Sequence, residues 1–273
     1  MYHSLYVCPL LQTSRRTLYQ GHRPDVQVVY LMPLYSILLA SRGRTQYLRE
    51  TIKSIETTAH NYEIILMIDD DDEETLKVAQ ELTKPNIFVH VRPRGNNFVE
   101  QYLNWGFQFA RATYILLLGD DVLFKTKDWD INAYARLEEY LKDKPDGIVL
   151  GITDDGILKH KIQGKEWGII SSCSFPIISR KGIEALGFVL DPSFYDESSD
   201  FSIVLTYSKV NRTIDLRDIV TTIHMPVEFT KKYGTIYHDK TYKGPYKEVS
   251  TIMKNGKTEE NAIINADKLR KFL

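Results

Sequence analysis

The sequence predicts an α/β fold built on a mostly parallel central sheet. Short apolar runs alternate with stretches of helical period from residue 34 to about residue 125, which is the order typical of right-handed βαβ units. Residues 114–118 are apolar or aromatic at every position, which indicates a strand buried on both faces, as in a parallel sheet. No internal repeat or low-complexity linker interrupts this order. We therefore expect a single α/β domain within the 273 residues.

The first predicted elements form a strand-helix-strand unit. Residues 36–40 are a short apolar strand, and a helix follows with Leu48 and Ile52 on its apolar face. Residues 63–68 form the second apolar strand, which ends in four consecutive aspartates. Asp72, the last of them, is expected to cap the next helix, because aspartate is a favoured N-cap residue.

Two further elements lead to the strand at 114–118. Residues 87–91 form the third predicted strand. Residues 97–112 are predicted as one continuous helix, because Val99 and Leu103 begin an apolar stripe of helical spacing.

The second half of the chain is less regular. Its predicted elements are strands at 147–151, 167–172 and 219–224, and helices at 179–186, from near residue 200, and at 258–272. Gly187 stands where a helix-terminating glycine is expected. Residues 1–33 show no clear period and are predicted to form an irregular arm.

Composition excludes several classes of protein. The formal net charge is -1, which argues against a nucleic-acid binder that relies on a basic face. Cys8 and Cys173 cannot make a disulfide framework and lack metal-site spacing, so a reducing compartment is expected. There is no apolar run long enough for a transmembrane segment and no signal-peptide pattern. We expect a cytoplasmic protein, with peripheral membrane association left open.

Acidic residues gather at or near the ends of predicted elements. Asp69–Asp72 follow the second strand, and Asp120 and Asp121 follow the fourth. Because the carboxyl ends of parallel strands meet at one edge of a sheet, both clusters should face one crevice. Adjacent carboxylates repel each other unless a cation or a hydrogen-bonding ligand lies between them. The alternative is a simple turn in which Asp120 and Asp121 cap the next segment.

The order of these motifs resembles the nucleotide-binding half of family 2 glycosyltransferases, which have the GT-A fold. The resemblance runs from Tyr35 to Val122. It consists of the short first strand, a helix containing Tyr47-Leu48 and residues 51–55, a strand ending in Ile68-Asp69-Asp70, and the run Asn104-Trp105-Gly106-Phe107-Gln108-Phe109-Ala110 before the acidic strand end.

The resemblance implies a nucleotide pocket at this edge. Asp69 or Asp70 would bind the nucleobase or ribose, and the segment Ala40, Ser41, Arg42 and Arg44 would line the same pocket. Asp120 would also contact the nucleotide.

A divalent metal site is implied beside this pocket. Asp120 and Asp121 would stand for the family's Asp-X-Asp motif, which binds the donor diphosphate through Mn²⁺ or Mg²⁺. The sequence departs from that motif, because Gly119 occupies its first position. Asp121 is therefore the more favoured ligand. His224, at the end of the 219–224 strand, matches the position of a third metal ligand in some GT-A enzymes, although a lone histidine on a strand is often structural.

The second half would supply the catalytic base. Ser198-Ser199-Asp200-Phe201 before a helix resembles the segment that carries this carboxylate, and Asp200 is preferred over its rivals Asp196 and Glu197. A general base must lie within hydrogen-bonding reach of the acceptor hydroxyl. The alternative role for Asp200 is a helix N-cap.

The sequence thus predicts an inverting, metal-dependent hexosyltransferase. The donor would be a UDP-, GDP- or dTDP-linked sugar, and the acceptor a glycan, a lipid-linked molecule or a protein. Residues 34–125 would form the nucleotide-sugar-binding half, 126–228 the acceptor-binding half and 229–273 a C-terminal loop and helix. Two alternatives stay open. One is a nucleotidyltransferase of related fold, weakened by the single glycine of residues 41–44; the other is a non-catalytic sugar-nucleotide-binding module, which Gly119 favours.

Overall fold

The computed structural model describes residues 32–153, 157–158, 161–162, 165–166, 170–171, 173–194, 199–225 and 257–273. For the described residues between 157 and 171, and for His224 and Lys257, it describes only the backbone. The predicted N-terminal arm, apart from its last two residues, and most of the predicted loop at 229–257 lie outside these ranges.

A seven-stranded sheet forms the centre of the described chain, with strand order β12-β6-β11-β4-β1-β2-β3. Six strands share one direction, and β11 runs against its neighbours β4 and β6. The predicted α/β class with a mostly parallel sheet is therefore confirmed. The strands are β1 (Tyr35–Ser41), β2 (Tyr62–Asp69), β3 (Ile87–Arg92), β4 (Tyr114–Leu118), β6 (Leu150–Ile152), β11 (Ile177–Ser179) and β12 (Thr213–Asp215).

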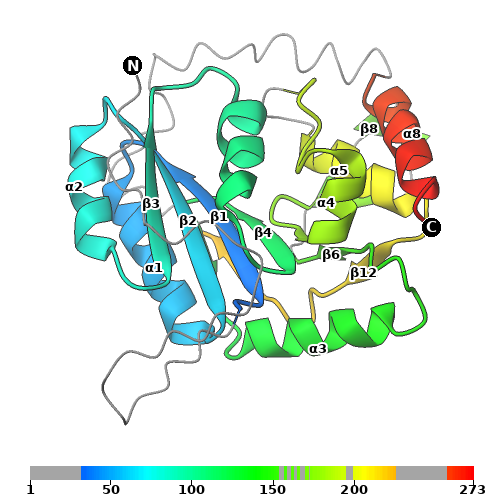
Figure 1. Ribbon diagram of the computed structural model, residues 1–273, viewed down its shortest axis with the longest axis horizontal. Helices are drawn as coiled ribbons and strands as arrows, with labels where there is room; N and C mark the ends of the chain where they lie inside the picture. Colours follow the sequence, from blue (N-terminus) through cyan, green and yellow to red (C-terminus); the bar gives the residue numbers. More distant parts are fainter. Residues whose placement is uncertain are drawn as a thin grey trace, which may run out of the picture. The chain divides into compact units, whose positions relative to one another are not determined.

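Helices cover both faces of this sheet (Figure 1). Successive side chains of a strand point to opposite faces, so Ile37 and Leu39 of β1 pack on one side and Leu38 on the other. This arrangement explains why the central strands are apolar at every position. The first face carries α1 (Thr45–Thr58), α2 (Glu73–Leu82) and α3 (Trp129–Leu141); the second carries η1 (Val99–Asn104), α4 (Arg180–Leu186), α5 (Ser199–Ser208) and α8 (Lys257–Arg270).

Three small two-stranded sheets complete the described elements. One of these sheets joins the acidic end of β4 to the second half of the chain, because its first strand begins directly after Asp121. The pairs are β5 (Val122–Phe124) with β13 (Thr222–His224), β7 (Ile157–Leu158) with β10 (Ile170–Ser171), and β8 (Lys161–Ile162) with β9 (Lys165–Glu166).

The helix ends agree with the predicted capping residues. Asp72 accepts the backbone N–H of Thr75 at 3.2 Å and so caps α2. Gly187 ends α4 with a φ of +85°, a left-handed conformation that glycine adopts without steric cost. The predicted helices near Asp200 and at the C-terminus appear as α5 and α8.

The helix predicted over 97–112 is present as an unbroken helical stretch from 98 to 109, which is shorter than predicted and not α-helical throughout. It consists mainly of the π-helix η1, followed by one α-helical step at Trp105 and Gly106 and a short 3₁₀ turn, η2 (Phe107–Phe109). Tertiary contacts set this geometry. A Cβ added at Gly106 would lie 2.4 Å from Met67 Sδ, so the chain passes close to β2 at this point. The Asn104 side chain accepts the N–H groups of Val189 and Leu190 at 2.8 and 3.2 Å and donates to the Leu190 carbonyl at 2.9 Å.

Helix α3 and strands β11 and β12 were not predicted from the sequence. The apolar face of α3 consists of the buried residues Trp129, Ala133 and Leu137, with Tyr134, Tyr140 and Leu141 partly buried beside them. The helix is also fixed by a buried charge: Asp130 accepts the backbone N–H groups of His60 and Asn61 at 2.8 and 2.7 Å. Such a tertiary contact has no signal in hydrophobic periodicity.

We expect Asn104→Ala to lower the free energy of unfolding by roughly 2–4 kcal/mol, because it removes three half-buried hydrogen bonds worth about 1 kcal/mol each. Urea-induced unfolding measures the change. The matched control is Asn132→Ala on the exposed surface of α3, which should change stability by less than about 0.5 kcal/mol. Equal stability of the two variants would contradict the bridging role of Asn104.

Candidate active site

The turn after β4 is held by its neighbours through its backbone. On one side, the Thr51 hydroxyl of α1 donates to the Asp120 carbonyl at 2.8 Å and accepts the Val122 N–H at 3.2 Å. On the other side, the Met225 N–H donates to the Asp121 carbonyl at 2.7 Å. The position of the two carboxylates is therefore set by α1 and by the segment after β13.

The presence of glycine at position 119 is explained by its close neighbour, the Asp121 carboxylate. A Cβ added at residue 119 would lie 2.8 Å from Asp121 Oδ1. A side chain at 119 and the present position of the Asp121 carboxylate therefore exclude each other. The acidic motif of this chain is the adjacent pair Asp120–Asp121, and a side chain at 119 would require the Asp121 carboxylate to move.

Asp120 is almost completely buried, with 1% of its surface exposed. Its Oδ2 accepts the Ser41 hydroxyl at 2.6 Å and Arg44 Nε at 3.2 Å, and its Oδ1 is bound by Arg44 Nη2. Burial raises the pKa of Asp120 to about 6, while the Arg44 charge and the Ser41 hydrogen bond oppose this rise. Asp121 is less buried and accepts Arg44 Nη1 at 3.1 Å. One guanidinium thus bridges both carboxylates.

Asp69 at the end of β2 is also buried, and both of its oxygens are engaged. Arg42 Nη1 donates to Oδ2 at 3.0 Å, and the Tyr102 hydroxyl of η1 donates to Oδ1. The same hydroxyl accepts the Gly95 N–H at 3.0 Å. Burial, followed by the hydrogen bond to Asp69, raises the pKa of Tyr102 to about 12. The sequence analysis did not identify Tyr102, because its role depends on where η1 packs.

Arg42 also binds the exposed Asp71. Its guanidinium contacts both carboxylate oxygens, with Nη2 at 3.0 Å from Oδ2, and this ion pair lowers the pKa of Asp71. Gly43, at a φ of +63°, directs its N–H to Asp72 Oδ2 at 2.7 Å and to Thr75 Oγ1 at 3.0 Å. Residues 42 and 43 are therefore bound to the acidic end of β2.

The β1 loop, residues 41–44, joins the two acidic clusters. Parallel pairing aligns Ser41 with Ile68 of β2 and Leu39 with Leu118 of β4. Continued by one or two residues, this register brings Arg42 beside Asp69 and Ser41 beside Asp120. The sheet order β4-β1-β2 thus produces the shared edge that the sequence predicted.

The other site residues predicted from the sequence lie near this edge, in α5, in β13 or outside the described ranges. Asp70 is exposed and Ala40 half-buried, both next to the β1 loop and the end of β2. Asp200 lies in the first turn of α5, half-exposed, with Oδ1 accepting the Phe201 N–H at 2.8 Å. His224 pairs through its backbone with Val122, next to Asp121, while its side chain is outside the description. Asp196 and Glu197 also lie outside the described residues.

The two carboxylates after β4 suit a divalent cation in their chemistry. Mg²⁺ is commonly bound by one or two protein carboxylates together with substrate phosphates. Within the described ranges, no three His, Cys, Asp or Glu side chains form a group able to hold a metal ion. Asp120 and Asp121 are thus the described residues that would hold such an ion, together with oxygens of a bound nucleotide.

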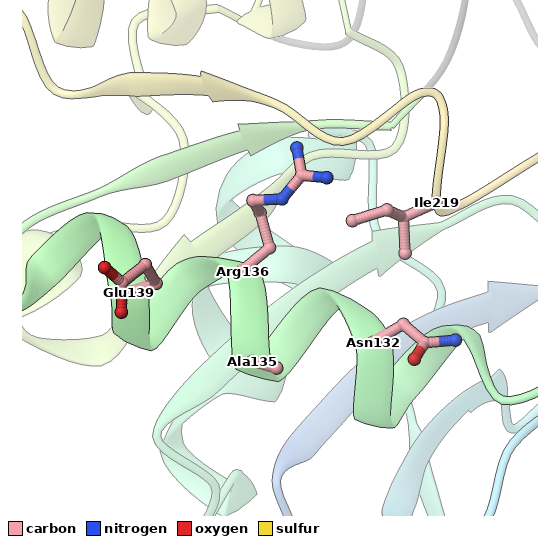
Figure 2. Close-up of a pocket in the computed structure, with 5 residues that line it drawn as sticks. All are labelled: Asn132, Ala135, Arg136, Glu139 and Ile219. Atoms are coloured by element: carbon pink, nitrogen blue, oxygen red, sulfur yellow. The ribbon is translucent and has the colours of Figure 1, made fainter.

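A shallow pocket lies elsewhere, along α3 (Figure 2). Figure 2 shows that four of its labelled residues come from this one helix and the fifth from the segment after β12. Arg136 in this pocket pairs with exposed Asp218 at 3.2 Å. The pocket contains none of the residues of the β1 loop or the acidic pair. Its lining residues are Asn132, Ala135, Arg136, Glu139 and Ile219.

Comparison with known proteins agrees with this fold. The sequence model of the family described as Glycosyl transferase family 2 matches residues 36–205, more than half of the chain. The protein therefore belongs to glycosyltransferase family 2. No curated protein matches the chain by sequence.

Solved glycosyltransferases share the GT-A-like fold. One is S. aureus TarS 1-349 in complex with UDP, at a TM-score of 0.51 and 12% identity over 67% of this chain and 58% of that one. Another is the mannosyltransferase PcManGT from Pyrobaculum calidifontis in complex with GDP-Man and Mn²⁺, at a TM-score of 0.51 and 14% identity over 70% of this chain and 56% of that one. The matched region thus spans less than two thirds of either structure. No helix in the described part of the chain is long and apolar enough to cross a membrane.

We expect Tyr102→Phe to lower the free energy of unfolding by about 1–3 kcal/mol, because it leaves buried Asp69 without one of its donors. Thermal or urea unfolding checks this. Tyr134→Phe on α3, where the ring packs edge-on against Tyr114, is the matched control and should be nearly neutral. A neutral Tyr102→Phe would show that the Asp69 contact does not stabilise the loop.

Proposed function

We propose that the protein transfers a sugar, with inversion, from a nucleoside-diphosphate donor to an acceptor hydroxyl, and that the reaction needs a divalent cation. The observation that carries this proposal is the β1 loop, whose residues 41–44 bind the acidic ends of both β2 and β4. One edge of the sheet thus offers groups for a nucleotide and for its diphosphate. Membership of family 2 and the nucleotides named in the two similar structures support the same proposal.

The nucleobase and ribose would bind beside the end of β2. Asp69 is buried and already accepts bonds from Arg42 and Tyr102, so its role here is to orient those two side chains. Exposed Asp70 and half-exposed Arg42 are the groups able to reach a base edge or a ribose hydroxyl. Ala40 and Ser41 would line the same pocket from β1.

The diphosphate would lie near Asp120, Asp121 and the N-terminus of α1. A bound Mn²⁺ or Mg²⁺ would supply Lewis-acid stabilisation of the negative charge on the leaving diphosphate. Asp120 and Asp121 would hold the ion. His224 stays the predicted third ligand, and the antiparallel pairing of its backbone with Val122 supports its nearness to the pair.

Asp200 would act as the general base. Its carboxylate would take the proton of the acceptor hydroxyl while the hydroxyl oxygen attacks the anomeric carbon from the face opposite the leaving group, which inverts that centre. The hydrogen bond from the Phe201 N–H to Oδ1 fixes one oxygen of this carboxylate in the first turn of α5. Asp196 and Glu197 stay its rivals.

A donor screen tests the activity. The full chain is incubated with UDP-, GDP- and dTDP-sugars, a panel of sugar, lipid-linked and peptide acceptors, and Mn²⁺, Mg²⁺ or EDTA, and released nucleoside diphosphate is measured. We expect release with one nucleotide class, its loss with EDTA, and its loss in Asp121→Asn. Nucleotide binding without release in any combination would favour the non-catalytic binding module. If wild type releases no more nucleoside diphosphate than Asp121→Asn does, the metal-binding role of Asp121 is contradicted.

Asp200→Asn tests the base. We expect transfer to fall by about 10²–10⁴-fold, the usual contribution of a positioned general base. Donor affinity should stay unchanged, because the base contacts the acceptor. Stability should also stay unchanged, because asparagine keeps a side-chain oxygen that can accept the Phe201 N–H. Asp143→Asn, at an exposed position after α3, is the control with full activity expected. Full activity in Asp200→Asn, with loss in Asp196→Asn or Glu197→Gln, would assign the role to one of those neighbours.

A further inference from the structure

The acidic pair already binds a cation that belongs to the chain. Arg44 contacts Asp120 through Nε and Nη2 and Asp121 through Nη1. The Asp120 carboxylate is buried and both of its oxygens accept Arg44 donors. A metal ion that used these oxygens would need the positions that the guanidinium N–H groups now occupy, and it would lie close to a positive charge.

The N-terminal end of α1 disfavours a positive charge at the position that Arg44 occupies. Arg44 is the N-cap residue of α1, a helix of 14 residues with no acidic side chain in its first turn. The N-terminal end of a helix carries partial positive charge, which repels a cation and attracts an anion. The carboxylates therefore offset this repulsion, and the Arg44 side chain, 25% exposed, borders solvent.

We propose that Arg44 and a divalent cation are alternative partners of Asp120 and Asp121, and that Arg44 transfers to the donor diphosphate when the ion binds. The proposal rests on the proposed function for the place of the diphosphate. It assigns Arg44 a positioning and charge-balancing role.

The charges of the site support this exchange. One guanidinium leaves the pair of carboxylates with a net negative charge, whereas a divalent ion neutralises it. Arg44 is then an excess positive charge at a helix N-terminus, which is a favourable place for a phosphate. Arginine binds phosphate oxygens through the same planar fork that it uses for carboxylates. The ion and the nucleotide should therefore strengthen each other's binding, and Arg44 should carry part of that coupling.

Calorimetry with Mn²⁺ alone tests the first half of the proposal. Wild type, Arg44→Gln and Arg49→Gln are titrated as full chains. Arg49 is also on α1, but it pairs with Glu81, so its substitution should leave Mn²⁺ affinity within about 2-fold of wild type. In Arg44→Gln the competing charge is gone, and we expect Mn²⁺ to bind at least about 10-fold more tightly. Arg44→Lys keeps a positive charge and should stay much closer to wild type than Arg44→Gln.

The second half is tested by repeating the Mn²⁺ titration with UDP or GDP present, using whichever nucleotide wild type binds. In wild type the nucleotide should raise Mn²⁺ affinity by some factor. In Arg44→Gln this ratio of Mn²⁺ affinities with and without nucleotide should be smaller by about 5-fold or more, because the bridging guanidinium is missing. An unchanged factor would overturn the transfer of Arg44 to the diphosphate.

The proposed competition between Arg44 and Mn²⁺ is overturned if Arg44→Gln binds Mn²⁺ with the same affinity as wild type or more weakly. It is also overturned if neither protein binds Mn²⁺. Arg44→Ser repeats the measurement if the glutamine variant does not fold. The Mn²⁺ titration uses no sugar donor, so its outcome is separate from the proposed activity. Tighter binding in Arg44→Gln by a protein that releases no nucleotide would support the competition and count against the transferase.

Discussion

Repulsion among carboxylates at the carboxyl edge of the sheet is the constraint on which the rest of the site depends. Asp69 and Asp120 are buried at the ends of β2 and β4, the two strands that flank β1, and burial of uncompensated charge is costly. The β1 loop resolves this by placing Arg42 on one cluster and Arg44 on the other. Arg42 and Arg44 therefore connect the two strand ends into one site.

The second half of the chain completes the same site through its backbone. The pairing of β13 with β5 fixes the turn that carries Asp121, and the Met225 N–H binds the Asp121 carbonyl. Asn104 joins η1 to the segment after α4 on the other face of the sheet. Residues 34–125 and residues 126–228 are thus tied together by hydrogen bonds.

Hydrophobic patterns predicted the elements that are continuous apolar runs and the helices that have a wide apolar face. These patterns predicted β1 to β4, α1, α2 and the helices near Asp200 and the C-terminus. They did not predict α3, which is anchored by buried Asp130, or the π and 3₁₀ geometry within the helical stretch 98–109, where Gly106 and Asn104 contact partners far away in the sequence.

The sequence by itself determined the α/β class, the acidic strand ends and the likeness to family 2 glycosyltransferases, because buried strands, caps and short motifs are local patterns. Only the tertiary structure decided which side chains meet. It placed Tyr102 on Asp69, Arg42 on Asp69 and Asp71, and Arg44 across Asp120 and Asp121. These contacts depend on the register of parallel strands and on the packing of η1, which bring together residues between 27 and 77 positions apart in the chain. No local pattern of residues encodes such distances.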